Sequence, residues 1–96
     1  MKPSQVLEAK RDAVRSMVRR YSASNPRVFG STVLGTDHDG SDLDILVDAL
    51  PGATLFDLGG LQEELQDLLG VRVDVLTLGD LPIKFRAQVI AHARSV

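Results

Sequence analysis

The sequence predicts an α/β (α+β) domain, in which helices flank a small mixed three-stranded sheet. Apolar residues recur with helical spacing in three segments, at residues 4–21, 55–69 and 83–94. Three short runs of β-type residues alternate with them, at residues 27–29, 42–47 and 71–76. The expected order is therefore α-β-(short α)-β-α-β-α, with one helical turn near residues 32–34. The second strand, second helix and third strand form one crossover unit, which tends to bring its two strands side by side.

Each helix is predicted from its apolar face and its end signals. The first ends before Pro26, because proline disfavours the helical conformation at the preceding residue. The second is weakened at Gly59 and Gly60 by about 1 kcal/mol per glycine relative to alanine, and Gly70 ends it. The expected apolar faces of the three helices contain Leu7, Val14, Met17, Val18 and Tyr21; Leu58, Leu61, Leu65, Leu68 and Leu69; and Ile83, Val89, Ile90 and Ala93.

The composition limits the class of protein. A chain of 96 residues has room for one domain, residues 1–96. The absence of cysteine excludes disulfides, thiolate zinc sites and cysteine nucleophiles, and it is typical of a reducing cytoplasm. No run reaches the ~18 apolar residues of a membrane span. We therefore expect a cytoplasmic protein that does not bind a membrane.

Charge is distributed unevenly along the chain, although the net charge is only −2. Residues 37–80 contain eleven acidic residues and one arginine, whereas both ends are basic. An acidic centre repels bare nucleic acid and attracts cations. We therefore expect the acidic centre to bind a metal ion and do not expect the protein to bind nucleic acid directly.

Three aspartates are the candidate metal ligands. Asp42 and Asp44 are two residues apart in a strand, so their side chains lie on the same face. Asp74 interrupts the apolar third strand, and the crossover unit places that strand next to the second. Carboxylates that lie this close repel one another unless a cation or a proton intervenes, and Mg²⁺ prefers such oxygen ligands. The alternative is that these aspartates are ordinary solvated residues at strand ends.

Gly30 and Ser31 follow the first strand and form a candidate phosphate-binding turn. Exposed backbone N–H groups at such a point hold phosphate, and glycine permits its close approach. An ordinary turn is the alternative. The spacing of Gly30 and Gly35 is that of a P-loop, but Thr36 stands where a P-loop has lysine, which rejects that motif.

Other polar residues of the acidic loop are interpreted as loop residues. Asp37, Asp39 and Gly40 do not match an EF-hand, because the glycine is misplaced and no ligating glutamate follows. His38 and His92 are isolated in the sequence and form no zinc-hydrolase pattern, so zinc-dependent hydrolysis is not expected.

The motifs resemble those of the polymerase-β-type nucleotidyltransferase superfamily. Gly30-Ser31, ten further residues and Asp42-x-Asp44 match its signature. Over essentially the whole chain, the sequence resembles the minimal nucleotidyltransferases, which are encoded beside HEPN-domain proteins in prokaryotic toxin–antitoxin pairs. The segments that carry this resemblance are Asn25-Pro26-Arg27-Val28-Phe29-Gly30-Ser31, Ser41-Asp42-Leu43-Asp44-Ile45-Leu46-Val47-Asp48, Leu61-Gln62-x-Glu64-Leu65 and Val73-Asp74-Val75-Leu76-Thr77.

The resemblance implies the nucleotidyltransferase fold and a Mg²⁺-dependent enzyme with ATP as its substrate. Asp42 and Asp44 would bind Mg²⁺, two ions when the nucleotide is bound. Asp74 would complete the metal site and help to deprotonate the acceptor hydroxyl. Gly30 and Ser31 would hold the terminal phosphates.

Three functions follow from these expectations. The first is an antitoxin that transfers AMP from ATP to a hydroxyl group of a partner HEPN toxin. The second is a binding module that neutralises its partner by contact alone; its motivation is Leu34, which stands where arginine is common in the family. The third is a metal-binding regulatory domain without a toxin partner.

Overall fold

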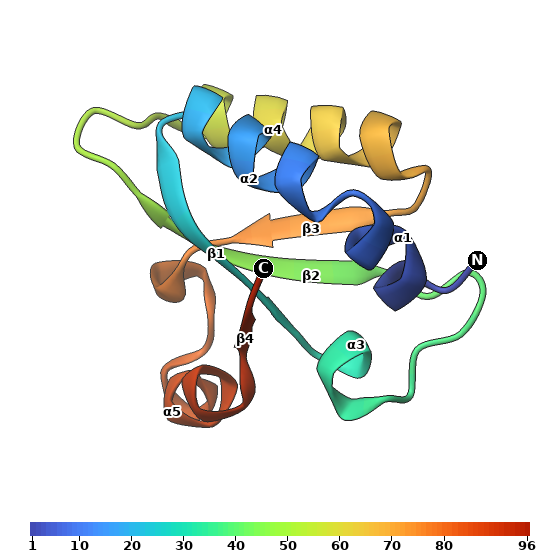
Figure 1. The fold of residues 1–96 in the computed structure, drawn as a ribbon. Coiled ribbons are helices and arrows are strands. Elements are labelled where there is room, and N and C mark those ends of the chain that lie inside the picture. Colours follow the sequence, from blue (N-terminus) through green and yellow to red (C-terminus); the bar gives the residue numbers. More distant parts are fainter.

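A four-stranded mixed sheet with the strand order β3-β2-β1-β4 forms the centre of the computed structural model, which describes all of residues 1–96 (Figure 1). The pairs β1–β2 and β1–β4 are antiparallel, whereas β2 and β3 run parallel. The predicted mixed sheet is confirmed, but the predicted number of three strands is wrong, because two residues at the end of the chain add β4. The strands are β1 (Ala23–Phe29), β2 (Leu43–Ala49), β3 (Val73–Leu76) and β4 (Arg94–Ser95).

The helices lie on both faces of this sheet. In Figure 1, α1, α2 and α4 lie above the sheet, while α3 and α5 lie below it. None of the helices is both long enough and apolar enough to cross a membrane. The helices are α1 (Pro3–Ala9), α2 (Arg11–Arg20), α3 (Ser31–Leu34), α4 (Leu55–Leu69) and α5 (Ile83–His92), and a 3₁₀ turn, η1, spans Leu78–Asp80.

The main core lies between the sheet and the pair α2 and α4. Leu43, Ile45 and Val47 alternate along β2 and are all at most 1% exposed, so they form the core face of the strand, opposite the face of Asp44. Leu46 on the opposite face is also buried, so both faces of β2 are covered at this point of the strand. The remaining members of the core cluster are Leu7, Val14, Met17, Val18, Ala23, Val28, Leu61, Leu65, Leu69, Val73 and Val96.

The first predicted helix is in fact two helices, α1 and α2, which are separated at Lys10. Lys10 leaves the helical conformation with φ −124° and ψ 24°, and its ammonium group donates a hydrogen bond of 2.7 Å to the Leu68 carbonyl near the end of α4. The apolar spacing did not reveal this break, because Leu7 and Val14 on either side of it are both buried. The positive charge of Lys10 also interacts favourably with the negative end of the α4 helix dipole.

The first strand begins four residues earlier than predicted, at Ala23. Its pairing with β2 is irregular between Ser24 and Arg27, where Asn25 has φ +52°. A bulge of this kind accommodates Pro26, which has no N–H group for the ladder. The helix ends before Pro26, as predicted, but its end at Arg20 lies well ahead of Asn25, the residue whose conformation Pro26 restricts. Pro26 itself lies inside the strand and does not prevent it.

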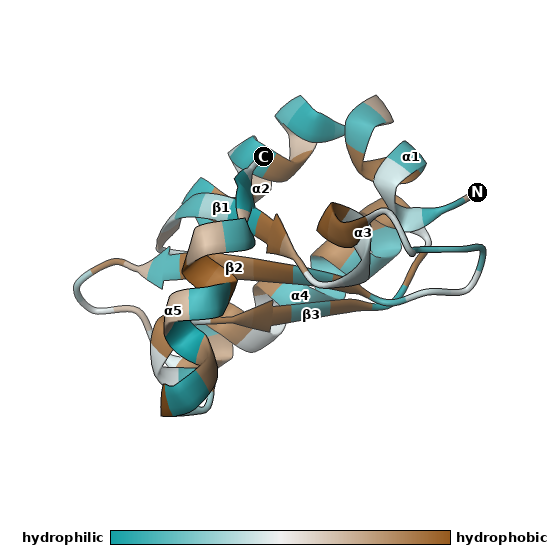
Figure 2. Ribbon diagram, turned by 90° about the horizontal axis from the view of Figure 1, so that it is seen from below, coloured by the Kyte–Doolittle hydropathy of each residue, from teal (hydrophilic) through white to brown (hydrophobic).

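The core positions predicted for the last helix are wrong. No residue of α5 is buried; Ile83 is 80% exposed and Ile90 is 50% exposed. Leu81 before the helix and Val96 after it are buried instead, so the chain is anchored at both sides of α5 rather than through it. Figure 2 shows α5 as a mixture of hydrophobic and hydrophilic residues in front of the largely hydrophobic strands β2 and β3.

Candidate active site

The candidate metal ligands lie on the face of the sheet opposite the main core. In the parallel ladder Asp44 of β2 pairs directly with Asp74 of β3, and on its other side Asp44 pairs with Phe29 of β1. The crossover unit therefore brings these two aspartates side by side, as the sequence predicts. Their roles as ligands remain a prediction.

Asp42 lies just before β2, at the rim of this face. Its Oδ1 is 3.8 Å from Nε of Arg72, and the side chain of Arg72 is 84% exposed. Ion pairs this exposed contribute little to stability. Arg72 therefore does not neutralise the acidic cluster, which here denotes Asp42, Asp44 and Asp74.

The electrostatic environment of Asp44 disfavours its charged form. Partial burial raises the pKa of Asp44, and the charges of Asp74 and Asp42 raise it further. The pKa of Asp48, four residues further along the same strand, is shifted in the opposite direction. The Asn25 amide and the Arg27 guanidinium, whose Nη2 is 2.7 Å from Oδ1 of Asp48, lower the pKa of Asp48. No cationic side chain balances the charge of Asp44. A bound metal cation could balance it.

The Gly30-Ser31 turn packs directly against Asp44. Gly30 precedes α3 with φ +77° and ψ −146°, a backbone conformation that is essentially restricted to glycine. A Cβ atom at position 30 would lie 2.7 Å from Oδ2 of Asp44. The predicted phosphate-binding turn and the predicted metal ligands therefore form one continuous site, and the expected short helix after the turn is α3.

The chemistry of these residues fits a hard divalent cation, although they do not form a closed cage. Carboxylate oxygens are the donors that Mg²⁺ prefers, and the raised pKa of Asp44 reflects negative charge that a cation would balance. However, the structure contains no group of three or more His, Cys, Asp or Glu side chains in a metal-holding arrangement.

The polar residues of the acidic loop have structural partners. Asp37 is buried, and its Oδ2 accepts a hydrogen bond of 3.0 Å from the backbone N–H of Ser4 in the first turn of α1. That hydrogen bond lowers the pKa of Asp37. Asp39 pairs with the amino group of Met1, and the backbone N–H of His38 donates to Oγ of Ser41. The interpretation as loop residues is confirmed, and Asp37 has the additional role of capping a distant helix.

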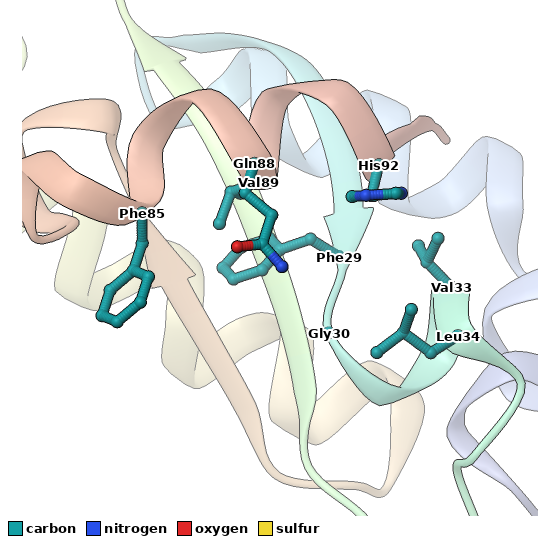
Figure 3. A pocket seen from close by; sticks show the side chains of 8 residues that line it. All are labelled: Phe29, Gly30, Val33, Leu34, Phe85, Gln88, Val89 and His92. Atoms are coloured by element: carbon teal, nitrogen blue, oxygen red, sulfur yellow. The ribbon is translucent and has the colours of Figure 1, made fainter.

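An apolar pocket adjoins the site, and the sequence analysis missed it. It has a volume of about 240 Å³ and lies between the end of β1, α3 and α5 (Figure 3). Phe29 points into it from the same sheet face as Asp44, a placement that the alternation along β1 could have indicated. The contribution of α5 has no sequence signal, because Phe85 and Gln88 belong to no recognised motif and Val89 is expected in the core. The lining residues are Phe29, Gly30, Val33, Leu34, Phe85, Gln88, Val89 and His92.

Comparison with known sequences identifies the class of protein. Residues 10–95 match the family model of the nucleotidyltransferase domain. The chain is 32% identical over 89 residues to the candidate protein adenylyltransferase MJ0435 of Methanocaldococcus jannaschii, an alignment that covers 93% of this chain and 95% of the relative. It is 37% identical over 67 residues to the protein adenylyltransferase MntA of Thermococcus cleftensis, which covers 70% of this chain and 68% of that relative. The chain belongs to the nucleotidyltransferase domain family.

Solved structures narrow this assignment. A candidate minimal nucleotidyltransferase shares 41% sequence identity with the chain at a TM-score of 0.86, covering 97% of this chain and 95% of the other. The protein described here is a minimal nucleotidyltransferase. A chain of the complex between the tri-AMPylated HEPN toxin of Shewanella oneidensis and its MNT antitoxin has the same fold, with a TM-score of 0.68 and 19% identity, covering 92% of this chain and 69% of that one.

Proposed function

We propose that this minimal nucleotidyltransferase is an antitoxin that transfers AMP from ATP to a hydroxyl group of a HEPN-domain toxin, in a reaction that depends on Mg²⁺. Two relatives that carry protein adenylyltransferase names support the reaction. The neighbour in a complex with an AMPylated HEPN toxin supports the partner. We expect the reaction to occur in the cytoplasm, in keeping with the cysteine-free composition.

One observation carries this proposal: Asp44 lies between Asp74 and the Gly30-Ser31 turn. A carboxylate cluster and a phosphate-binding turn in direct contact are the two parts that a phosphoryl-transfer site requires. Asp42, Asp44 and Asp74 would hold Mg²⁺, which when bound neutralises charge on the phosphoryl oxygens. The backbone of Gly30 and the hydroxyl of Ser31 would bind the terminal phosphates.

The transfer itself is a displacement at phosphorus. The acceptor hydroxyl oxygen forms a bond to the α-phosphorus of ATP, the bond from that phosphorus to the bridging oxygen breaks, and pyrophosphate leaves. The proton of the hydroxyl passes to a carboxylate, and Asp74 is our candidate because it lies beside Asp44 and is exposed. No covalent intermediate with the enzyme is required.

The decisive experiment combines the purified protein and its HEPN partner with Mg²⁺ and ATP labelled on the α-phosphate. We expect label on the partner with the wild-type protein and none with Asp44→Asn. Asp48→Asn is the matched control, since it removes an aspartate from the same strand that is already paired with Arg27. Labelling by Asp44→Asn at the wild-type rate, or none by the wild type, would refute the proposal.

A second candidate function is neutralisation of the partner by contact alone. Leu34, the residue that replaces a common arginine of the family, is 66% exposed and provides no charge near the turn. If Asp42→Asn and Asp44→Asn both neutralise the toxin as well as the wild-type protein does, contact and not AMP transfer is the function.

A further inference from the structure

The apolar pocket shares a residue with the candidate active site. Gly30 belongs to the pocket lining and also touches Asp44. Phe29, the preceding residue, pairs with Asp44 in the β-ladder and contributes its side chain to the pocket (Figure 3). A ligand whose phosphates lie at the Gly30-Ser31 turn would therefore have the pocket within reach of its other end.

The size and lining of the pocket suit a flat aromatic group. Pockets for whole drug-sized ligands have volumes of about 300–1,000 Å³, so a pocket of about 240 Å³ takes only part of a nucleotide. Five of its eight lining residues are hydrophobic, including Phe29 and Phe85. Aromatic side chains bind nucleobases by stacking and burial of apolar surface.

Gln88 supplies the polar group that such a pocket needs for specificity. Its side chain extends from α5 toward Phe29 (Figure 3). The amide presents one acceptor and two donors, so it can make a two-bond contact with the N6 donor and N7 acceptor of adenine. The corresponding edge of guanine presents two acceptors and cannot be matched in this way.

We propose that this pocket binds the adenine base of the nucleotide, with Phe29 and Phe85 contacting its rings and Gln88 reading its polar edge. The proposal rests on the proposed function, because it assigns one part of the substrate of that same site. It also accounts for Phe85, which is 46% exposed on a helix without a single buried residue and therefore has no role in the main core.

Leu34 has a role in this interpretation. The same side chain that provides no charge for the phosphates lines the pocket and extends its apolar surface. Contact with the base would then supply part of the affinity that an arginine at this position gives through charge. The nucleotide affinity of this chain is therefore expected to depend more on the base than on the terminal phosphates.

The test compares ligands with and without a base. Dissociation constants are measured by calorimetry, in the presence of Mg²⁺, for ATP, GTP, purine riboside triphosphate and inorganic tripolyphosphate. We expect Phe85→Ala to weaken ATP binding about tenfold and to leave tripolyphosphate binding unchanged. We expect Gln88→Leu, which keeps the side-chain size, to weaken ATP binding at least about fivefold. It should weaken purine riboside triphosphate binding by less, because that ligand lacks the N6 donor and keeps only the N7 acceptor.

Ile83→Ala is the control, because Ile83 is an exposed apolar residue of the same helix that does not line the pocket. All three substituted side chains are exposed, so the variants should fold. Equal binding of ATP and tripolyphosphate by the wild type would overturn the proposal. So would variants at positions 85 and 88 that bind ATP like Ile83→Ala.

The outcomes also separate this proposal from the proposed function. If AMP transfer to the toxin occurs but the pocket variants show no base-dependent loss, the base lies elsewhere. If no transfer occurs but ATP binding depends on Phe85 and Gln88 as described, the pocket is a base site in a protein with another function.

Discussion

Gly30 and Asp44 are in contact so closely that a Cβ atom at position 30 would approach Oδ2 of Asp44 to 2.7 Å. These residues come from different elements, the turn after β1 and the start of β2, and antiparallel pairing brings them together. The position of the proposed phosphate-binding turn is thereby fixed relative to the acidic cluster. Any side chain at position 30 must move one of the two.

Gly30→Ala is expected to abolish AMP transfer and to destabilise the protein. The backbone conformation at this position costs an L-residue about 1–3 kcal/mol, and the new methyl group displaces the Asp44 carboxylate. Gly52→Ala is the control, since Gly52 also has a positive φ of +88° but has no atom within 4 Å of an added Cβ. Urea unfolding and the transfer assay measure both effects. Normal transfer by Gly30→Ala would show that the contact does not matter for the reaction.

Asp44→Asn is expected to stabilise the metal-free protein while it removes activity. The folded-state pKa of Asp44 is raised, so its ionised form opposes folding. That penalty begins as the pH rises past the unfolded value of about 3.9, and it is complete above the folded pKa. Removal of the charge should therefore raise the free energy of unfolding at pH 7 by about 1 kcal/mol, a gain common for favourable single substitutions.

Mg²⁺ provides the complementary measurement on Asp44. A ligand that binds only the folded state adds about 2.7 kcal/mol of stability at a concentration 100 times its dissociation constant. We expect thermal unfolding of the wild type to shift upward with Mg²⁺, and the shift to be lost in Asp44→Asn and kept in Asp48→Asn. An equal shift in all three proteins would place the cation outside the acidic cluster.

The adjacent glycines of α4 are expected to respond oppositely to alanine. Gly59 has open space around an added Cβ, so Gly59→Ala should stabilise the protein by about 1 kcal/mol through helix propensity. At Gly60 the added Cβ would lie 2.8 Å from Cε1 of Tyr21. This clash should outweigh the gain in helix propensity, so Gly60→Ala should lower the stability of the protein. Urea unfolding of the two variants provides the comparison. Equal stabilisation by both would mean that the Tyr21 ring moves aside without cost.

Asp37→Ala is expected to cost about 1 kcal/mol, the usual effect of removing a helix cap. Its control is Asp39→Ala, whose side chain is 88% exposed and whose loss should change stability by less than about 0.5 kcal/mol. The lowered pKa of Asp37 means that its contribution is present above the unfolded pKa and disappears as the pH falls toward the folded one. Unfolding measured from pH 7 to pH 3 should therefore show a smaller acid-dependent loss in Asp37→Ala than in the wild type.

The sequence was sufficient to predict the central features of the fold and the candidate site. Alternation along β2 separates Leu43, Ile45 and Val47 from Asp44, and this separation is local information. The neighbouring position of Asp74 follows from the crossover connection, which is a general rule of parallel strands. Both predictions depend on strand geometry rather than on distant contacts.

The features that were missed depend on contacts between distant parts of the chain. The hydrogen bond from Ser4 to Asp37 spans 33 residues and has no signal in either segment. The strand β4 consists of two residues, Arg94 and Ser95, which pair with Arg27 and Val28 of β1, far away in the sequence. The spacing of Ile83 and Ile90 indicates a helix correctly, but it cannot show that the sheet face beneath this helix carries the acidic cluster and a pocket instead of a second apolar core.

The alternation along β2 also has a consequence for how such a domain can change over generations. Residues that hold the fold and residues proposed for chemistry occupy successive positions of one strand, yet they face different sides of the sheet. A single exchange of a carboxylate could therefore silence the enzyme without disturbing its shape. An active enzyme and an inactive protein that still binds the same toxin would then differ by a single amino-acid substitution. Evolution could exchange one for the other in either direction.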